Sequence, residues 1–380
     1  MDYSFQKSLL CLNDIELEAL RLLPKEYGDY YKSGADNELT LKRNLDGFRN
    51  FLIRPFCLRD VSNADTSVTI RLGNEKFSFT HPIGISPSAF HGLAHKDGEL
   101  LTVRACNKEN IPVIFSTMGN VSVSNLGKEM NGDTSLWFQL FVYKNREITK
   151  ELIINARNAG FKAIVLTADT PVVGNRKADI RNSFKLPDHL DLANLRDIHP
   201  LNEENKSRVG TFKFNQYSAE FFDASLTFND VKWLVEYSKM PVIIKGILRG
   251  DDAEKAIEAG VSAIMVSNHG GRQLDSTIST IEALPEIVRA VRKRVPIFID
   301  GGIRNGNDIF KAIALGADMA FIGRPILYGL AIGGEEGIIH VLKILKREFE
   351  STMKLAGCHS IDFMKNANNL VIRSIDIPNL

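Results

Sequence analysis

The stretch VIIKGILRGDDAEKAIEAGVSAIMVSN, Val242–Asn268, contains the pattern that decides the fold. Its two ends, 242–246 and 263–268, are short runs rich in Val and Ile, which are typical of parallel strands buried on both faces. Between them, DDAEKAIEAG begins with acidic residues and closes on Gly260, as amphipathic helices do. A strand, a helix and a second strand in this order predict a parallel α/β unit.

The same unit recurs along the chain. Helical patterns also occupy REITKELIINARNAG (146–160) and GNDIFKAIALGA (306–317). Eight β-rich runs alternate with such patterns, and eight units favour a closed (β/α)₈ TIM barrel over an open sheet. The runs span 82–86, 113–117, 136–141, 163–169, 242–246, 263–268, 297–302 and 320–324.

The segments outside these units complete a single predicted domain, 1–380. We expect a helical extension over 1–75, with a break at Pro24, then the barrel over 76–355 and a C-terminal tail over 356–380.

The spacing of the units has one exception, since the fourth and fifth runs begin at residues 163 and 242. The excess, roughly 175–227, is polar and weakly periodic. Long loops in compact domains are often lids over a site. The two interpretations are a long loop after strand four that is mobile without substrate and a passive surface insertion.

Composition excludes several classes of function. Lys plus Arg is 47 against 46 for Asp plus Glu, a net charge of +1, so nothing favours nucleic acid or an anionic membrane as a partner. No apolar run reaches the roughly 18 residues of a membrane span, and the first residues lack the pattern of a signal peptide. The four cysteines are scattered, which predicts an intracellular, reducing setting and no metal site. The final Pro-Asn-Leu is at most a degenerate peroxisomal signal.

Polar residues stand where the predicted strands end. In a TIM barrel these carboxyl ends meet at one mouth, where active sites form. A lysine, a histidine, two aspartates and an arginine at one mouth favour a reaction site over coincidence; they are Lys245, His269, Asp169, Asp300 and Arg324.

A row of hydrogen-bonding side chains, Ser116, Gln139, Thr167 and Lys245, can line a flat heteroaromatic ring. In that arrangement Lys245 would place positive charge against a ring that gains electrons. The alternative for Lys245 is a Schiff-base lysine, as in barrel aldolases.

The last two units predict a phosphate site. Gly301, Gly302 and Arg304 follow strand seven, and Gly323 and Arg324 follow strand eight. Glycines let backbone N–H groups approach an anion, and arginines supply the opposite charge. TIM barrels often bind phosphate at this place, so a phosphorylated cofactor or substrate is expected.

His269 lies just past a strand end, with Arg272 three residues on and two glycines between. A base with a pKa near neutral beside a guanidinium that can grip a carboxylate suits proton abstraction next to that carboxylate. Asp169 can stabilise the imidazolium, and Arg176 is a candidate second anchor for the carboxylate.

The motif SNHGGRQLD (267–275) resembles the active-site signature of the FMN-dependent (S)-2-hydroxy-acid oxidases. DYYKSGADNELTL, TADTPVVGNRKADIRN, IIKGIL, DGGIRNGNDIFKAIALGA and FIGRPILYGL are similar to that family in the same order over nearly the whole chain. TPVVGNR and FHGL favour the long-chain oxidases of animals.

The resemblance implies a role for each candidate residue. His269 would be the base paired with Asp169, and Lys245 would stabilise the reduced flavin. Arg272, Arg176 and Tyr30 would bind the substrate carboxylate. Pro87, Ser88, Ala89, Ser116, Gln139, Thr167 and Ser267 would line the flavin, and Asp300, Gly301, Gly302, Arg304, Gly323 and Arg324 would hold the ribityl phosphate. The resemblance further implies O₂ as acceptor, a homotetramer and a peroxisomal location.

Two positions depart from the family pattern. Phe141 stands where the family usually has Tyr, and Tyr143, two positions on, is too far along the strand to replace it. Met118 stands where short-chain oxidases usually carry a bulky aromatic residue. Methionine is narrow and adaptable, which favours a longer or branched substrate.

Two other functions remain open. Because of Phe141, one hypothesis is a chain that binds FMN with weak or lost oxidase activity, and a panel of hydroxy acids would then fail to bleach the flavin. A non-redox FMN barrel such as a type 2 isopentenyl diphosphate isomerase would need magnesium, but neither His269 nor Arg272.

Overall fold

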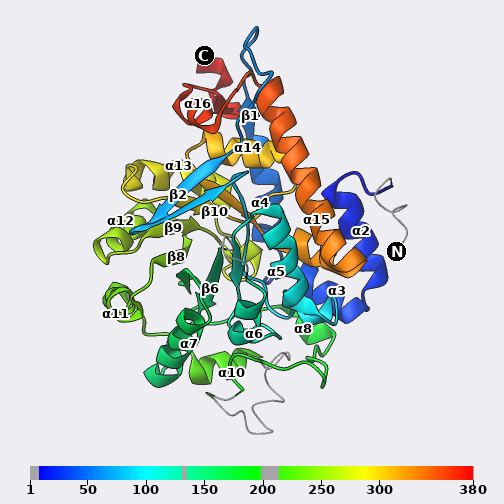
Figure 1. The fold of residues 1–380 in the computed structure, drawn as a ribbon, viewed down its shortest axis with the longest axis vertical. Coiled ribbons are helices and arrows are strands. Elements are labelled where there is room, and N and C mark those ends of the chain that lie inside the picture. The colour runs from blue at the N-terminus through cyan, green and yellow to red at the C-terminus, as the bar shows by residue number, and fades with distance from the viewer. Residues whose placement is uncertain (1–7, 131–134, 197, 199–213, 380) are drawn as a thin grey trace.

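A closed barrel of eight parallel strands forms the centre of the computed structural model (Figure 1), which describes residues 8–130, 135–196, 198 and 214–379. Each strand overlaps one of the eight predicted runs, so the TIM barrel prediction is confirmed. The strands are β4 (Ile83–Ile85), β5 (Val113–Phe115), β6 (Leu136–Leu140), β7 (Ala163–Thr167), β8 (Val242–Ile247), β9 (Ala263–Val266), β10 (Ile297–Ile299) and β11 (Met319–Ile322).

The inside of the barrel is packed with aromatic side chains. Trp137, Phe298 and Phe321 have ring centroids 5.4–5.8 Å apart. Gly84 makes room for them, because a Cβ on it would lie 2.4 Å from the Phe321 ring. Side chains alternate along a strand, so Gln139, two residues after Trp137, points inward at the level of the mouth.

Helices surround the barrel, as the predicted alternation requires. Asparagines cap two of them: Asn145 accepts from the amide of Glu147, and Asn305 from that of Asp308. The helices are α5 (Gly98–Glu109), α6 (Val123–Lys128), α7 (Arg146–Asn158), α11 (Phe228–Ser238), α12 (Gly250–Glu258), α13 (Thr280–Val291), α14 (Gly306–Ala314) and α15 (Arg324–Leu355), with short 3₁₀ turns η2 (His91–Leu93) and η3 (His269–Gly271). Among the described residues, no helix is long and apolar enough to cross a membrane.

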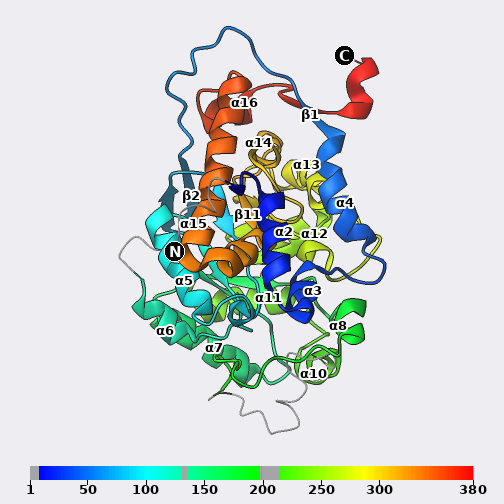
Figure 2. The ribbon, with the colours of Figure 1, turned by 90° about the vertical axis from the view of Figure 1, so that its right-hand side faces the viewer.

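The N-terminal extension is helical only in its first part. Figure 2 shows α2 (Leu12–Leu22) alongside α15; α3 (Lys25–Lys32), α4 (Leu39–Gly47) and η1 (Phe48–Asn50) follow. Pro24 separates α2 from α3, as predicted.

The prediction of helix up to residue 75 is wrong beyond η1. The chain forms β1 (Phe51–Ile53) and a hairpin of β2 (Val68–Leu72) and β3 (Glu75–Phe79). The strand β2 alternates buried and exposed residues and is followed by Gly73-Asn74, a two-residue hairpin signal that was readable in the sequence. Phe77 of the hairpin packs edge-on against Trp137 and closes that end of the barrel core.

The C-terminal tail packs back on the extension. It contains α16 (Ile361–Asn366), β12 (Val371–Arg373) and η4 (Ser374–Asn379), and β12 pairs antiparallel with β1. The single-domain organisation stays a prediction.

The long loop after β7 contains α8 (Lys177–Arg181) and α10 (Phe214–Phe221). Its first part is bonded to the loop after β5: the side chain of Asn194 accepts from the amide of Val123 at 2.8 Å and donates to the carbonyl of Thr117 at 3.2 Å. These bonds attach that part of the loop to the segment that follows β5. Residues 197 and 199–213 lie outside the described residues, and the mobile lid stays a prediction.

Candidate active site

One pocket opens at the carboxyl ends of the strands and encloses about 1230 Å³, its open mouth included. Of the predicted site residues, all but two line it: Tyr30, Pro87, Ser88, Ala89, Ser116, Gln139, Thr167, Arg176, Lys245, His269, Arg272, Asp300, Gly301, Gly302, Arg304, Gly323 and Arg324. The other two, Asp169 and Ser267, are hydrogen-bonded directly to lining residues.

Three strands contribute a buried polar row to the pocket. The side-chain oxygen of Gln139, Oε1, accepts from the Ser116 hydroxyl at 3.3 Å, and its side-chain nitrogen, Nε2, donates to the Thr167 hydroxyl at 3.0 Å. These bonds fix which end of the glutamine amide is donor and which is acceptor. The row can therefore read the edge of a flat ring, as predicted.

Lys245 lies at the base of this row. Its ammonium donates to the Ser267 hydroxyl at 2.8 Å and lies 3.5 Å from the carboxylate of Asp300, both side chains being almost fully buried. A carboxylate at this distance attracts the positive charge of the ammonium. This contact favours the electrostatic role of Lys245 over the Schiff-base alternative.

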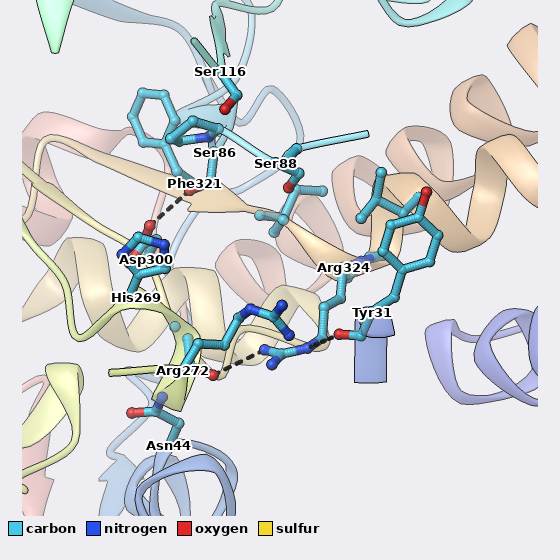
Figure 3. Close-up of a pocket in the computed structure, with 18 of the residues that line it drawn as sticks. Tyr31, Asn44, Ser86, Ser88, Ser116, His269, Arg272, Asp300, Phe321 and Arg324 are labelled. Atoms are coloured by element: carbon cyan, nitrogen blue, oxygen red, sulfur yellow. Dashed lines mark hydrogen bonds between the residues drawn. The ribbon is translucent and has the colours of Figure 1, made fainter. Parts of the chain in front are cut away.

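Asp300 does not fit a role in holding phosphate directly, since its carboxylate would repel the phosphate charge. One of its oxygens, Oδ2, accepts from the Ser86 hydroxyl at 2.8 Å (Figure 3). The other, Oδ1, is buried and has no hydrogen-bond partner in the described chain. An orphaned acceptor of this kind suits the hydroxyl groups of a ribityl chain.

His269 is held by a buried carboxylate. Its Nδ1 lies 2.8 Å from Asp169 Oδ1, as predicted, which leaves Nε2 for a ligand. Burial lowers the pKa of His269 from its usual 6.5, and Asp169 offsets part of this change. Burial would raise the pKa of Asp169, but His269 and Lys245 outweigh it and the net pKa is lowered. A neutral imidazole beside an ionised carboxylate is the form that accepts a proton.

Two guanidinium groups lie at the same side of the pocket. One nitrogen of Arg272, Nη1, donates to the carbonyls of Tyr30 and Ser33. Arg176 Nε is buried without a hydrogen-bond partner in the described chain. Burial, followed by repulsion from Arg272, lowers the pKa of Arg176 to about 10, so both groups are charged at neutral pH. A carboxylate placed here would relieve the repulsion and satisfy the free donor.

Tyr30 is held in the pocket by contacts with Phe184 and Arg272. Its ring stacks on that of Phe184, with the centroids 4.6 Å apart, and its centroid lies 5.0 Å from the guanidinium carbon of Arg272. Burial raises the pKa of Tyr30, which keeps the phenol protonated and able to donate. Sequence patterns did not point to Phe184, because nothing in a polar loop marks one ring as a partner of α3.

The phosphate end of the pocket combines glycines with helix starts. Gly301 and Gly302 have φ of +90° and +86°, and α15 begins directly after Gly323. Helix N-termini bind phosphate through free amides. Nη1 of Arg304 lies 3.4 Å from Glu16 Oε2, an ion pair without a hydrogen bond in the described chain. These groups fit the phosphate of a mononucleotide.

Arg324 forms contacts beyond the predicted one (Figure 3). Its three guanidinium nitrogens donate to the carbonyls of Tyr31, Gly270 and Ser33, so it links the extension to the His269 loop. A guanidinium has five N–H donors, which leaves two, and its contact with the phosphate stays a prediction. Sequence spacing could not distinguish a phosphate ligand from such a link.

The wall opposite His269 is apolar. Phe141 lines the pocket, and its ring stacks on Phe222 at 4.7 Å. Met118 also lines it, whereas Tyr143 is fully buried elsewhere and does not. Tyr143 therefore does not supply the hydroxyl that Phe141 lacks, as expected.

Twelve other lining residues had not been predicted, and four of them come from the N-terminal extension. They are Tyr31, Leu41, Asn44, Leu45, Ser86, Phe90, Gly270, Ile303, Phe321, Ile322, Pro325 and Leu327. Leu41, Asn44 and Leu45 share one face of α4 at helical spacing, a signal that marks a packed face but not what it packs on.

Fold and site together define a flavin-binding TIM barrel oxidoreductase. The chain belongs to the FMN-dependent dehydrogenase family, whose model matches residues 19–370. Its cofactor is therefore FMN, and this placement argues against the diphosphate isomerase alternative.

Named relatives agree with this placement. The chain is 43% identical to human 2-hydroxyacid oxidase 1 over 93% of its length and 94% of that protein. It is 44% identical to the peroxisomal (S)-2-hydroxyacid oxidase GLO4 of Arabidopsis thaliana, covering 90% and 92%. A crystal structure of mandelate oxidase with (S)-4-hydroxymandelic acid superposes with a TM-score of 0.88 at 34% identity, covering 96% of this chain and 99% of that one.

Proposed function

We propose that this FMN-dependent enzyme oxidises an (S)-2-hydroxy acid to the 2-oxo acid. One observation supports it above all: His269, paired with Asp169, lines the same pocket as two guanidiniums, one of which has a free donor. A 2-hydroxy acid presents a carboxylate and, on the next carbon, the protons that a base removes.

The residues divide the work by their charge. Arg176 and Arg272 bind the substrate carboxylate, with Tyr30 donating a further hydrogen bond. His269 accepts the substrate proton through Nε2, and Asp169 stabilises the resulting imidazolium. Lys245 holds positive charge where the ring is expected to gain electrons. Bound FMN would supply the two-electron acceptor that this oxidation needs, with O₂ as the final oxidant and H₂O₂ as the product.

For the substrate we propose a medium-chain, long-chain or branched acid. Met118 and Phe141 form an apolar wall, and neither offers a donor to a short polar substrate. Each methylene buried against such a wall contributes about 0.8 kcal/mol, or roughly fourfold in kcat/KM.

A panel of 2-hydroxy acids of two to eight carbons tests both parts of the proposal. Anaerobic mixing should bleach the flavin absorbance, with kcat/KM rising along the series, and aerobic turnover should release one H₂O₂ per 2-oxo acid. A preference for the two-carbon acid would contradict the proposed chain length, and no bleaching by any acid would contradict the activity.

A second candidate function rests on Phe141. If the missing hydroxyl is essential, the protein binds FMN but has weak or lost oxidase activity, and the panel leaves the flavin oxidised.

Phe141→Tyr separates the two candidates. In an active oxidase the added hydroxyl contributes one hydrogen bond, and we expect kcat/KM to change by about tenfold or less. Stacking on Phe222 should hold the new ring in place. Stopped-flow bleaching measures the change; an increase of several orders of magnitude from an almost inactive parent would favour the second candidate.

The rate should depend on pH through His269. Since burial lowers its pKa, kcat/KM should stay constant above pH 6.5 and fall as the pH drops through a lower apparent pKa. Asp169 raises that pKa, so Asp169→Asn should move the acid limb to still lower pH and reduce the plateau by about 100-fold. Stopped-flow rates across pH 4–9 check this; a limb that moves to higher pH in the variant would contradict the assigned pair.

For location and assembly we propose the peroxisome and a homotetramer, which the family resemblance supports. A fluorescent fusion and light scattering of the holoenzyme test them separately.

A further inference from the structure

We propose that Asn44 is a positioning residue for His269, acting through Asn268. The inference rests on the proposed function, because it takes His269 as the base. The two asparagines are buried and exchange hydrogen bonds: Asn44 Nδ2 donates to Asn268 Oδ1 at 2.8 Å, and Asn268 Nδ2 donates to Asn44 Oδ1 at 2.7 Å. Loss of one amide would leave the other buried with unsatisfied polar atoms.

The backbone that carries His269 needs such support. His269 has φ of +57°, a left-handed conformation that is unfavourable for a residue with a side chain, and Gly270 and Gly271 continue it at +64° and +75°. Strained segments persist only where their surroundings over-determine them. Asn268 supports this left-handed segment, because its side chain accepts from the backbone amide of Gly271 at 3.2 Å and donates to the backbone carbonyl of Ile278 at 3.2 Å.

The helix that carries Asn44 also contacts the phosphate end of the pocket. A Cβ at Gly302 would lie 2.0 Å from the Asn44 carbonyl oxygen, and one at Gly271 would lie 2.7 Å from the Leu41 backbone. Asn44 therefore contacts both the predicted phosphate loop, at Gly302, and the loop of the base, at Asn268; Figure 3 shows it beside Arg272. Through this contact, binding of phosphate at one loop can change the conformation of the other loop.

Arg272 is held independently of Asn44. Its bonds run to the carbonyls of Tyr30 and Ser33, in front of α4 in the chain. A change at Asn44 should therefore disturb the base more than the carboxylate anchor, and kcat more than KM.

Asn44→Leu tests the assignment in the FMN-saturated holoenzyme. We expect kcat for flavin reduction to fall about 100-fold, the loss that a shift of about 1 Å in a catalytic group produces, while KM stays within about threefold. Lys42→Leu, on the exposed face of the same helix, is the control and should keep both constants. An unchanged kcat, or a loss confined to KM, would overturn the proposal.

Hydrogen exchange gives a readout that does not depend on turnover. FMN binding to the wild-type protein should protect the amides of 268–272 and 301–304, whereas in Asn44→Leu only 301–304 should gain protection. Equal protection of both loops in the variant would also overturn the proposal. If Asn44→Leu does not fold, the nearly isosteric Asn44→Asp, which keeps only the bond donated by Asn268, is measured in the same way. A wild-type enzyme that oxidises no hydroxy acid would instead defeat the proposed function, since these exchange differences would still be observable.

Discussion

Flavin reduction by a 2-hydroxy acid should slow by about 10⁴-fold when His269 is replaced by alanine, the upper range for loss of a positioned base. The neighbouring polar groups cannot take over. Lys245, Arg176 and Arg272 carry positive charge, and burial keeps the phenol of Tyr30 protonated. The measurement is anaerobic stopped-flow bleaching with the best acid of the panel.

His269→Gln and His189→Ala complete this experiment. Glutamine keeps a polar side chain but accepts no proton at neutral pH, so it should be almost as slow as alanine. His189 is an exposed histidine of the long loop, and its loss should leave the rate unchanged. Because most of the predicted FMN contacts come from other strands, all variants should retain the yellow cofactor. Normal bleaching by His269→Ala would exclude this residue as the base.

Arg176→Lys should lower kcat/KM by about 100-fold, mainly through a higher KM. The lysine keeps the charge but loses the planar pair of donors that matches a carboxylate, and a hydrogen-bonded charge pair at a buried site contributes about 2–5 kcal/mol. The free Nε of Arg176 is the donor that the substrate is expected to satisfy. Steady-state oxidation of one acid at several concentrations gives both constants.

Arg181→Lys is the matched control for this variant, since Arg181 is the last residue of α8, which begins directly after Arg176, and is exposed. It should leave kcat and KM unchanged. A second check uses the amide of the same hydroxy acid, which lacks the charge: wild type should discriminate strongly against it, and Arg176→Lys should discriminate less. An Arg176→Lys enzyme with wild-type KM would remove Arg176 from the carboxylate site.

The barrel could be predicted because its signal is local. Each strand is a continuous apolar run bounded by turn residues, and each helix has a cap or a terminal glycine, so 242–268 already contains the repeating unit. The hairpin of β2 and β3 shows the limit, since its alternation and Gly73-Asn74 turn are equally local but lie inside a segment predicted as helical.

The candidate site could be predicted in part for a related reason. Parallel strands of a barrel end at one mouth, so residues at strand ends, such as Lys245 and His269, had to converge whatever the exact packing. The pairing of His269 with Asp169 followed from the same geometry. The residues that hold the site residues in place, such as Phe184 and Asn44, could not be predicted in this way. They lie in segments whose position depends on long-range contacts.

The sequence by itself determined the strand order, the mouth, the FMN family signature and the residue types that face the ligand, because these depend on short-range periodicity and on fixed positions within motifs. Tertiary structure decided which acceptor each guanidinium and side-chain amide group bonds. Arg324 and Arg304 look alike in the sequence, yet Arg324 bonds three backbone carbonyls while Arg304 forms an ion pair with Glu16. Asn44 meets Asn268 across 224 residues. A guanidinium or an amide can bond any acceptor in reach, so only the packing of α4 and the extension against the barrel selects which one it bonds.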